Sequence, residues 1–232
     1  MKKLIRLSFA LALLCAAFST ATFASSMFLV QGIAGRDRSP ATDPAYPVDV
    51  LLNDEACNEH GMAFGTIVGP LTFEPGSYNV KVSIANTLAP CSNPPLIDKD
   101  VTIDPRTDIS AVFALTEDGA PTLLTFTNDF TSVAAGMSRI LFAQAANAAP
   151  VEVTFENTAT SKSYSYTVDR GSLLDVSLPA GLYTVTVTLG KTTLVAATPL
   201  NLFAQAAALV YTTGEASNGS VTLETRIVRD VL

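Results

Sequence analysis

The sequence predicts an all-β protein built from two tandem immunoglobulin-like antiparallel β-sandwiches. Strand-length segments in which apolar and polar residues alternate recur along the chain, and this period of two is typical of half-buried strands. Proline, glycine, asparagine and aspartate, the usual turn residues, separate the segments. The same order of segments occurs twice, and TFEPGSYNVKV (72–82) returns as SLPAGLYTVTV (177–187). Repeats of about seven or eight short strands are typical of immunoglobulin-like sandwiches.

Each repeat contains the same five recognisable segments. An apolar strand comes first, then a strand entered at a proline, a strand after a proline–glycine corner, a long apolar strand and a last strand. The first repeat has FLVQGIAG (28–35), PVDVLLND (47–54), TFEPGSYNVKV (72–82), ISAVFAL (109–115) and TLLTFTN (122–128). The second has ILFAQAAN (140–147), PVEVTFEN (150–157), SLPAGLYTVTV (177–187), ALVYTTG (208–214) and VTLETRIV (221–228).

Turns and a linker complete the predicted organisation. Asp118-Gly119 and Asn218-Gly219 each precede the last strand of a repeat, and Asp-Gly or Asn-Gly is a strong hairpin signal. Residues 129–138 indicate a short linker, at which we expect limited proteolysis to release two resistant halves. The predicted units are residues 1–24 as a signal peptide, 25–131 as the first sandwich and 132–232 as the second.

Alternation also predicts which side chains form the core. Val48, Val50 and Leu52 share one strand face, and Val151, Val153 and Phe155 match them in the second repeat. We expect these six to be buried, and the intervening Asp49 and Glu152 to point outward into solvent. Tyr164 and Tyr166 could form an aromatic platform for sugar rings, but Val168 continues their face and favours core packing. The alanine-rich stretch 134–149 resembles a helix, yet its place in the repeat predicts a strand.

The amino end predicts export. Three positive residues within the first six precede a short apolar stretch, residues 9–18, and small residues lie before Ser25. This pattern is typical of a secretory signal, because the apolar stretch is too short to span a bilayer. We expect cleavage after Ala24 and a periplasmic or extracellular protein. Cys15 could instead carry a lipid, but Leu14 stands where a lipoprotein signal needs a small residue.

Charge excludes several classes of partner. The formal net charge of the chain is −7, and loss of the three basic leader residues makes it −10. A chain this acidic does not favour nucleic acid or anionic membrane surfaces. The charge is unevenly distributed, with −9 on residues 25–131 and −1 on residues 138–232. If one repeat recognises a partner, we therefore expect it to be the first.

Cysteine use agrees with export. Cys57 and Cys91 are the two cysteines after the leader, and an even number in an oxidising compartment favours a disulfide. On the chain-entropy model such a bond contributes about 3–4 kcal/mol. Two free thiols or two metal ligands are the alternatives, although the spacing matches no zinc pattern.

The residues offer little catalytic chemistry. His60 is the single histidine, and no Gly-x-Ser-x-Gly motif accompanies it. We therefore predict no enzymatic activity, no cofactor and no metal. The segment NDEACNEHGM is nevertheless the densest group of oxygen ligands, so a cation site there stays conceivable. A partner-binding loop is the main functional hypothesis for this segment, with Asp54, Glu55, Glu59 and His60 as its residues.

Five short motifs stand out in the two repeats: Pro47-Val48-Asp49-Val50, Phe64-Gly65, Pro75-Gly76-Ser77-Tyr78, Pro150-Val151-Glu152-Val153 and Pro179-Ala180-Gly181-Leu182-Tyr183. Together they resemble those of a bacterial family, the domain of unknown function 4397. The resemblance implies a secreted sandwich without an assigned activity. Members often carry a histidine in the first strand, where this chain has Gln31 and Gln144.

The resulting functional prediction is a non-enzymatic secreted or periplasmic module of the bacterial cell envelope. It would bind or scaffold a protein or a glycan through exposed loops. One alternative is a structural subunit of a surface assembly. The other is a glycan-active enzyme that uses two carboxylates, which would need both in one pocket.

Overall fold

A computed structural model describes residues 25–34 and 47–228. The predicted signal peptide, its cleavage site after Ala24 and residues 35–46 lie outside these residues. Within them every regular element is a strand apart from one short 3-10 turn, Ala216–Asn218. No helix in the described part of the chain is long and apolar enough to cross a membrane.

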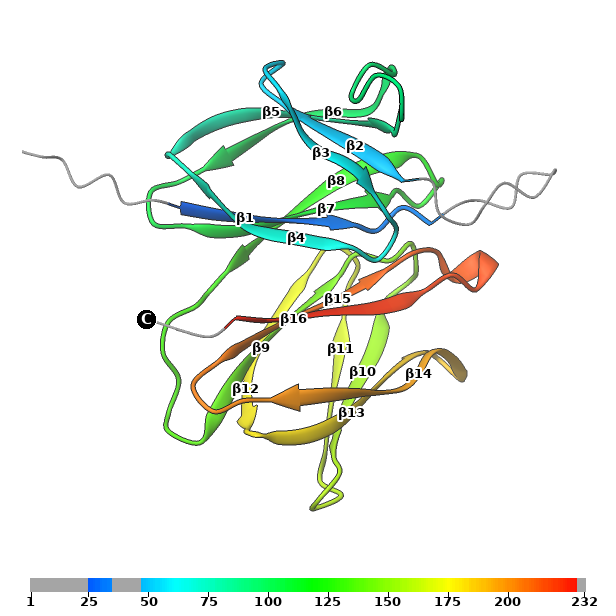
Figure 1. The fold of residues 1–232 in the computed structure, drawn as a ribbon. Coiled ribbons are helices and arrows are strands. Elements are labelled where there is room, and N and C mark those ends of the chain that lie inside the picture. The colour runs from blue at the N-terminus through cyan, green and yellow to red at the C-terminus, as the bar shows by residue number, and fades with distance from the viewer. Residues whose placement is uncertain (1–24, 35–46, 229–232) are drawn as a thin grey trace, which may run out of the picture.

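The first unit is a sandwich of two four-stranded sheets (Figure 1). Its inner sheet has the order β4-β1-β7-β8 and its outer sheet the order β3-β2-β5-β6. The bounds are β1 (Ser25–Gln31), β2 (Val48–Leu52), β3 (Cys57–Met62), β4 (Ile67–Phe73), β5 (Gly76–Ile84), β6 (Pro95–Ile103), β7 (Asp108–Leu115) and β8 (Pro121–Asn128).

The second unit repeats this arrangement strand for strand. Its inner sheet has the order β12-β9-β15-β16 and its outer sheet the order β11-β10-β13-β14. The bounds are β9 (Met137–Gln144), β10 (Val151–Asn157), β11 (Ser163–Val168), β12 (Leu173–Pro179), β13 (Gly181–Leu189), β14 (Thr192–Leu202), β15 (Ala207–Thr213) and β16 (Thr222–Val228). The all-β class and the two sandwiches are therefore confirmed.

The strand order adds detail that the sequence did not contain. In each inner sheet the first strand of the unit pairs in parallel with the seventh, β1 with β7 and β9 with β15. All other strand pairs are antiparallel. In an immunoglobulin constant-type sandwich the first strand lies beside the second, whereas here it lies between the fourth and the seventh.

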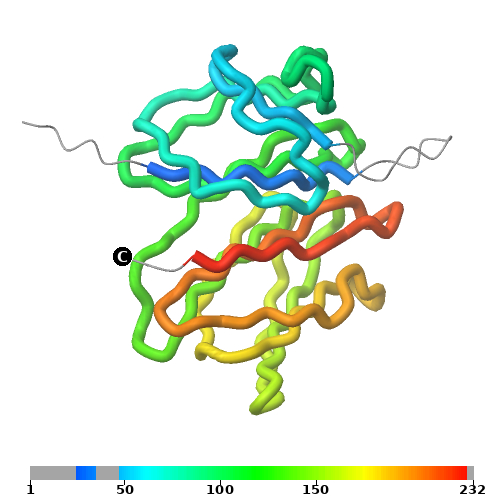
Figure 2. Tube along the Cα trace, in the orientation of Figure 1, coloured from blue at the N-terminus to red at the C-terminus, as the bar shows by residue number. Residues whose placement is uncertain are grey.

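The two units stack so that their inner sheets face each other (Figures 1 and 2). Alternate residues of β1 consequently enter different cores, Met27 and Leu29 the core of the first unit and Phe28 and Val30 a third core between the units. The fully buried residues of this third core come from both units: Phe28, Val30, Val112, Phe126, Leu141, Ala143, Ala145, Leu209 and Tyr211. The molecule thus has four sheet layers and three apolar cores.

Polar contacts also join the units. The Ser110 hydroxyl lies 2.6 Å from the Tyr211 hydroxyl, and both residues are buried. Gly214 donates its N–H to the Gly32 carbonyl at 3.1 Å. The segment that connects the units, residues 129–136, is attached to the second unit. The Arg139 guanidinium on β9 lies 2.6 Å from the Asp129 carboxylate at the start of this segment. The release of two resistant halves by proteolysis stays a prediction, and these contacts would hold the two units together after a cut in the connecting segment.

The predicted cores agree with the structure, with one correction. Val48, Val50 and Leu52 are buried, as are their three counterparts in the second unit. Tyr164 and Tyr166 are half-buried against the core of the second unit, as expected. Glu152 is exposed as predicted, but the prediction for Asp49 is wrong because its side chain is fully buried.

Candidate functional site

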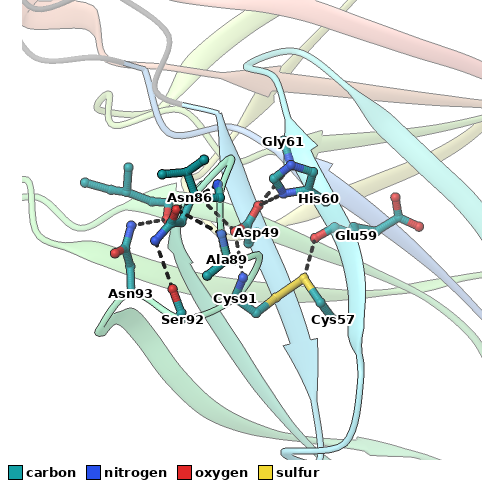
Figure 3. A network of polar contacts seen from close by, with 12 residues as sticks. Asp49, Cys57, Glu59, His60, Gly61, Asn86, Ala89, Cys91, Ser92 and Asn93 are labelled. Carbon is teal, nitrogen blue, oxygen red and sulfur yellow. Dashed lines mark hydrogen bonds and ion pairs between the residues drawn. A yellow bond between two sulfur atoms is a disulfide. The ribbon is translucent and has the colours of Figure 1, made fainter.

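Asp49 lies on the outer face of the outer sheet of the first unit, beneath a folded loop (Figure 3). Its Oδ1 atom accepts from the Gly61 N–H at 3.0 Å and lies 2.7 Å from His60 Nδ1. Its Oδ2 atom accepts from the N–H groups of Asn86 at 3.0 Å and Cys91 at 2.8 Å. One carboxylate therefore holds strand β3 and the β5–β6 loop together.

The β5–β6 loop, residues 85–94, explains why Asp49 is buried while Glu152 is not. In the second unit the corresponding connection is only residues 190–191. The longer loop folds back over the sheet, and the Cys57–Cys91 disulfide fastens it to the start of β3 (Figure 3). The predicted disulfide is thus confirmed, and it closes the same structure that Asp49 organises.

The loop is ordered by its own amide side chains. Asn86 accepts the N–H groups of Leu88 at 3.0 Å and Ala89 at 3.2 Å, and donates from Nδ2 to the Ser92 hydroxyl at 2.9 Å. Such side-chain turns fix a loop without regular secondary structure. At the tip, the Leu88 side chain is 95% exposed. The loop therefore presents a large apolar side chain from a well-supported backbone.

The β2–β3 turn forms the other end of this surface. Asn53 and Asp54 both have φ of 54°, a left-handed conformation that these residue types tolerate. The Lys81 ammonium lies 2.6 Å from the Asp54 carboxylate, and this contact raises the pKa of Lys81. An open hollow of about 210 Å³ lies between turn and loop, lined by Leu51, Asp54, Lys81, Ser83, Cys91, Asn93 and Pro95.

We call the two segments 53–61 and 85–94, joined by the disulfide, the loop platform. The four predicted partner-binding residues all lie on its first segment but do not converge. Asp54 pairs with Lys81, whereas His60 pairs with Asp49 and has a side chain that is 43% exposed. Glu55 is exposed and Glu59 half-buried. Their role in partner binding remains a prediction.

The electrostatics of the platform centre on Asp49. Burial raises the pKa of its carboxyl, but hydrogen bonds from the Cys91, Asn86 and Gly61 amides and from His60 outweigh burial. The net effect lowers the pKa, because hydrogen bonds to the charged form stabilise it. Asp49 is therefore an anion that is held by the protein rather than one offered to a ligand.

The platform also contains one group of potential metal ligands. Ligand atoms of Asp49, Cys57 and Cys91 lie within 4.8 Å of one another. The two sulfurs share a disulfide, so neither is the thiolate that a metal would need, and the carboxylate is already occupied by hydrogen bonds. In the described residues no other such group of three converges. The oxidised platform thus does not fit a metal.

Two residues that matter here, Asp49 beneath the loop platform and Leu88 at its tip, could not be recognised from the sequence pattern. Asp49 occupies the same place in its strand as Glu152, so strand alternation cannot distinguish the buried acid from the exposed one. Leu88 lies in a segment without periodicity. A leucine between Asn86 and Cys91, in a loop absent from the second repeat, was the available signal.

Comparison with known proteins identifies a family. The family model described as Domain of unknown function (DUF4397) matches residues 39–154, half of the 232-residue chain. This span contains β2 to β9 and part of β10. No curated protein matches the chain.

Three solved structures show weak similarity. The Bacillus anthracis TIE protein is 10% identical with a TM-score of 0.27, over 81% of this chain and 33% of that one. A candidate cell adhesion protein from Bacteroides ovatus is 12% identical with a TM-score of 0.30, and the match covers 89% of this chain and 98% of that one. Another from Bacteroides uniformis is 9% identical with a TM-score of 0.28, over 89% and 98%. This chain thus spans about a third of the Bacillus protein.

Proposed function

The chain belongs to the DUF4397 family, and within it we propose that this protein is an exported, non-enzymatic binding or scaffold module of the bacterial cell envelope. The proposal assigns partner recognition to the loop platform of the first unit. It assigns support to the second unit, in which the connection that matches the β5–β6 loop is only residues 190–191. The partner is a protein or a glycan outside the cytoplasm.

One observation carries the proposal: a buried carboxylate fixes two loops that present an exposed leucine. Asp49 contributes nothing to solvent-facing chemistry, yet four groups from the platform converge on it. Loops that are held in place before binding lose little conformational entropy when a partner arrives. Leu88, projecting from such a loop, has the form of an aliphatic anchor that a partner pocket would bury.

The acidic surroundings favour a partner with basic or hydroxyl groups. Asp54, Glu55, Asp98 and Asp100 are exposed on or beside the platform, and Asn79 bridges Asp98 and Asp100 through its amide nitrogen at 2.8 and 3.0 Å. Charges at the rim of an interface mainly govern association rate and specificity. We therefore expect binding to weaken at high salt without being abolished.

The experiment compares two exposed leucines. Leu88 and Leu182 are both large exposed apolar residues, 95% and 50% exposed, on the first and second unit respectively. Wild-type protein, Leu88→Ser and Leu182→Ser are immobilised and incubated with envelope extract and with an array of envelope glycans. We expect capture to be lost in Leu88→Ser and kept in Leu182→Ser, with both variants folded. Equal capture by the two variants would contradict the assignment to the platform.

The non-enzymatic part has its own test. Wild-type protein and alanine variants of Asp54, Glu59 and His60 are incubated with envelope polysaccharides, and reducing ends are measured. We expect no turnover by any of the proteins. Turnover by the wild type that disappears in one of the variants would replace the binding function with a catalytic one.

Export is tested at the amino terminus. Mass spectrometry of the protein recovered from the periplasm and the culture medium should find a mature chain that starts at Ser25. A chain that begins at Met1, or protein recovered from the cytoplasm alone, would contradict export.

A further inference from the structure

The four sheets of the molecule have eight edge strands, and most of these edges are covered. Edge strand β6 lies against β8 in the first unit, and β14 lies against β16 in the second. Edge strand β4 lies against β16 of the other unit, where Arg226 Nη2 donates to the Gly69 carbonyl at 3.2 Å. Among the described strands, no further strand packs extensively along the other three edges, β3, β11 and β12.

Two of these three edges carry features that hinder pairing with another chain. Strand β3 pairs with β2 through two register shifts and contains Glu59 and His60. Strand β12 has the exposed Asp175 at its centre and ends at Pro179. Charges, proline and irregular register are the usual protection of a sheet edge.

Strand β11 lacks this protection within its own residues, and the nearest charge is Lys162 just before it, whose ammonium lies 4.9 Å from the centroid of the Tyr164 ring. Its sequence, SYSYTV, contains no charge and no proline, and its six residues pair with β10 without a register shift. The hydroxyl-bearing Ser163, Ser165 and Thr167 are exposed, whereas Tyr164 and Tyr166 are half-buried on the core side. Of these three edges it is the one that is both regular and neutral.

The order of residues in β11 indicates which strand would pair with it. Residues 163–167, S-Y-S-Y-T, are nearly the same in both directions about Ser165. Antiparallel pairing of two such strands about this residue places Ser165 opposite its own copy and Tyr164 opposite Tyr166. Like side chains then meet on each face, aromatic with aromatic and hydroxyl with hydroxyl, and such cross-strand pairs stabilise a sheet.

We propose that β11 pairs antiparallel with β11 of a second copy of this chain, joining two four-stranded outer sheets into one continuous eight-stranded sheet. The contact is two-fold symmetric and closes at a dimer. The surface involved lies on the second unit and leaves the loop platform of the first unit free, so the proposal stands apart from the proposed function.

Charge on the outer sheet does not oppose this pairing. Glu156 lies opposite Ser163, and Glu152 lies opposite Thr167, on strand β10. In the symmetric register Ser163 meets Thr167 of the second copy, so these two acids are separated by three strand spacings, about 14 Å. That distance exceeds the Debye length of about 8 Å at physiological salt.

The test is the oligomeric state of the oxidised mature chain, residues 25–232, by sedimentation velocity at up to about 100 µM. We expect a dimer in the wild type and a dissociation constant about tenfold or more higher in Ser165→Lys, because two like charges then face each other across the two-fold axis of the interface. Thr193→Lys, which adds the same charge to the same face at the opposite edge, should dimerise like the wild type.

A cysteine variant tests the register independently of these effects. Residues directly opposite in an antiparallel pair have Cβ atoms about 4.5–5.5 Å apart, close enough for Ser165→Cys to form a disulfide between copies with slight adjustment. Oxidation should link Ser165→Cys into dimers on a non-reducing gel, and leave Thr193→Cys monomeric. A wild type that stays monomeric, a dimer unaffected by Ser165→Lys, or equal linking of both cysteine variants would each overturn the proposal.

Discussion

Replacement of Asp49 by asparagine tests whether this carboxylate organises the loop platform. An asparagine side chain has the same shape but a single acceptor oxygen. If that oxygen keeps His60 and Gly61, the amide nitrogen faces the N–H groups of Asn86 and Cys91, which the wild-type oxygen accepts at 3.0 and 2.8 Å. Two partly buried donors then lose their acceptor, and each such loss costs about 1–3 kcal/mol where the donor is shielded from water.

The expected loss in the free energy of unfolding is about 2–4 kcal/mol. This is less than the full cost of two unpaired donors, because water entering under the loop would hydrogen-bond to them in part. Urea denaturation of the oxidised protein measures this loss, and amide hydrogen exchange should show faster exchange at Asn86 and Cys91. The control is Glu152→Gln at the matching exposed position, which should change stability by less than about 0.5 kcal/mol. An equally small change in Asp49→Asn would refute the role of Asp49.

The lowered pKa of Asp49 also predicts how stability changes with pH. The pKa of Asp49 is lowered in the folded protein, so its contribution is fully present above its unfolded pKa of about 3.9 and is lost as pH falls through the folded value. The stability difference between the wild type and Asp49→Asn should therefore be constant near neutral pH and shrink below about pH 4. A difference that grows on acidification would contradict this sign.

Other consequences of the structure concern the disulfide and the joint between the units. Joint replacement of Cys57 and Cys91 by serine opens a loop with a sequence separation of 34 and should cost about 3–4 kcal/mol in urea denaturation; an unchanged midpoint would contradict it. Leu209→Ala, in the core shared by both units, should cost about 2–5 kcal/mol and lower the melting temperature of one common transition in calorimetry, whereas two separate transitions would show independent units. Gly32→Ala would place a Cβ atom 2.7 Å from the Phe113 carbonyl oxygen and 2.9 Å from Thr213 Cγ2. It should therefore lower the free energy of unfolding by about 1–3 kcal/mol. An unchanged stability would show that the contact between the two units adjusts easily to the extra atom.

Alternation predicted the fold well where a sheet has one face in water. In β10, Val151, Val153 and Phe155 are buried and Glu152 between them is exposed, so the period of two follows directly from solvation. In the inner sheets this signal is lost because both faces are covered. Strand β7 is buried from Ile109 to Leu115, as continuous apolar strands usually are. The sequence thus indicated these strands but not the third core that they help to form.

The loop platform was less predictable because its centre depends on contacts between distant segments. The number of cysteines and the export signal were enough to predict the disulfide. His60 could be named as a candidate because it is the single histidine of the sequence. The burial of Asp49 depends instead on residues 85–94 folding over β2, through hydrogen bonds from Asn86 and Cys91. The local pattern Val-Asp-Val does not predict whether its acid is buried. The second unit has the same pattern, Val-Glu-Val, and there the acid is exposed.

The face-to-face packing of the inner sheets limits how many copies such a chain can usefully contain. Phe28 and Leu141 follow the same register in their units, as do Val30 and Ala143, and all four lie in the shared core. Each unit therefore supplies the cover for the apolar sheet of the other. A gene duplication that added a third unit would leave its inner sheet without a counterpart, exposed to water and prone to aggregation. In this architecture a third unit would need a fourth one to cover its inner sheet.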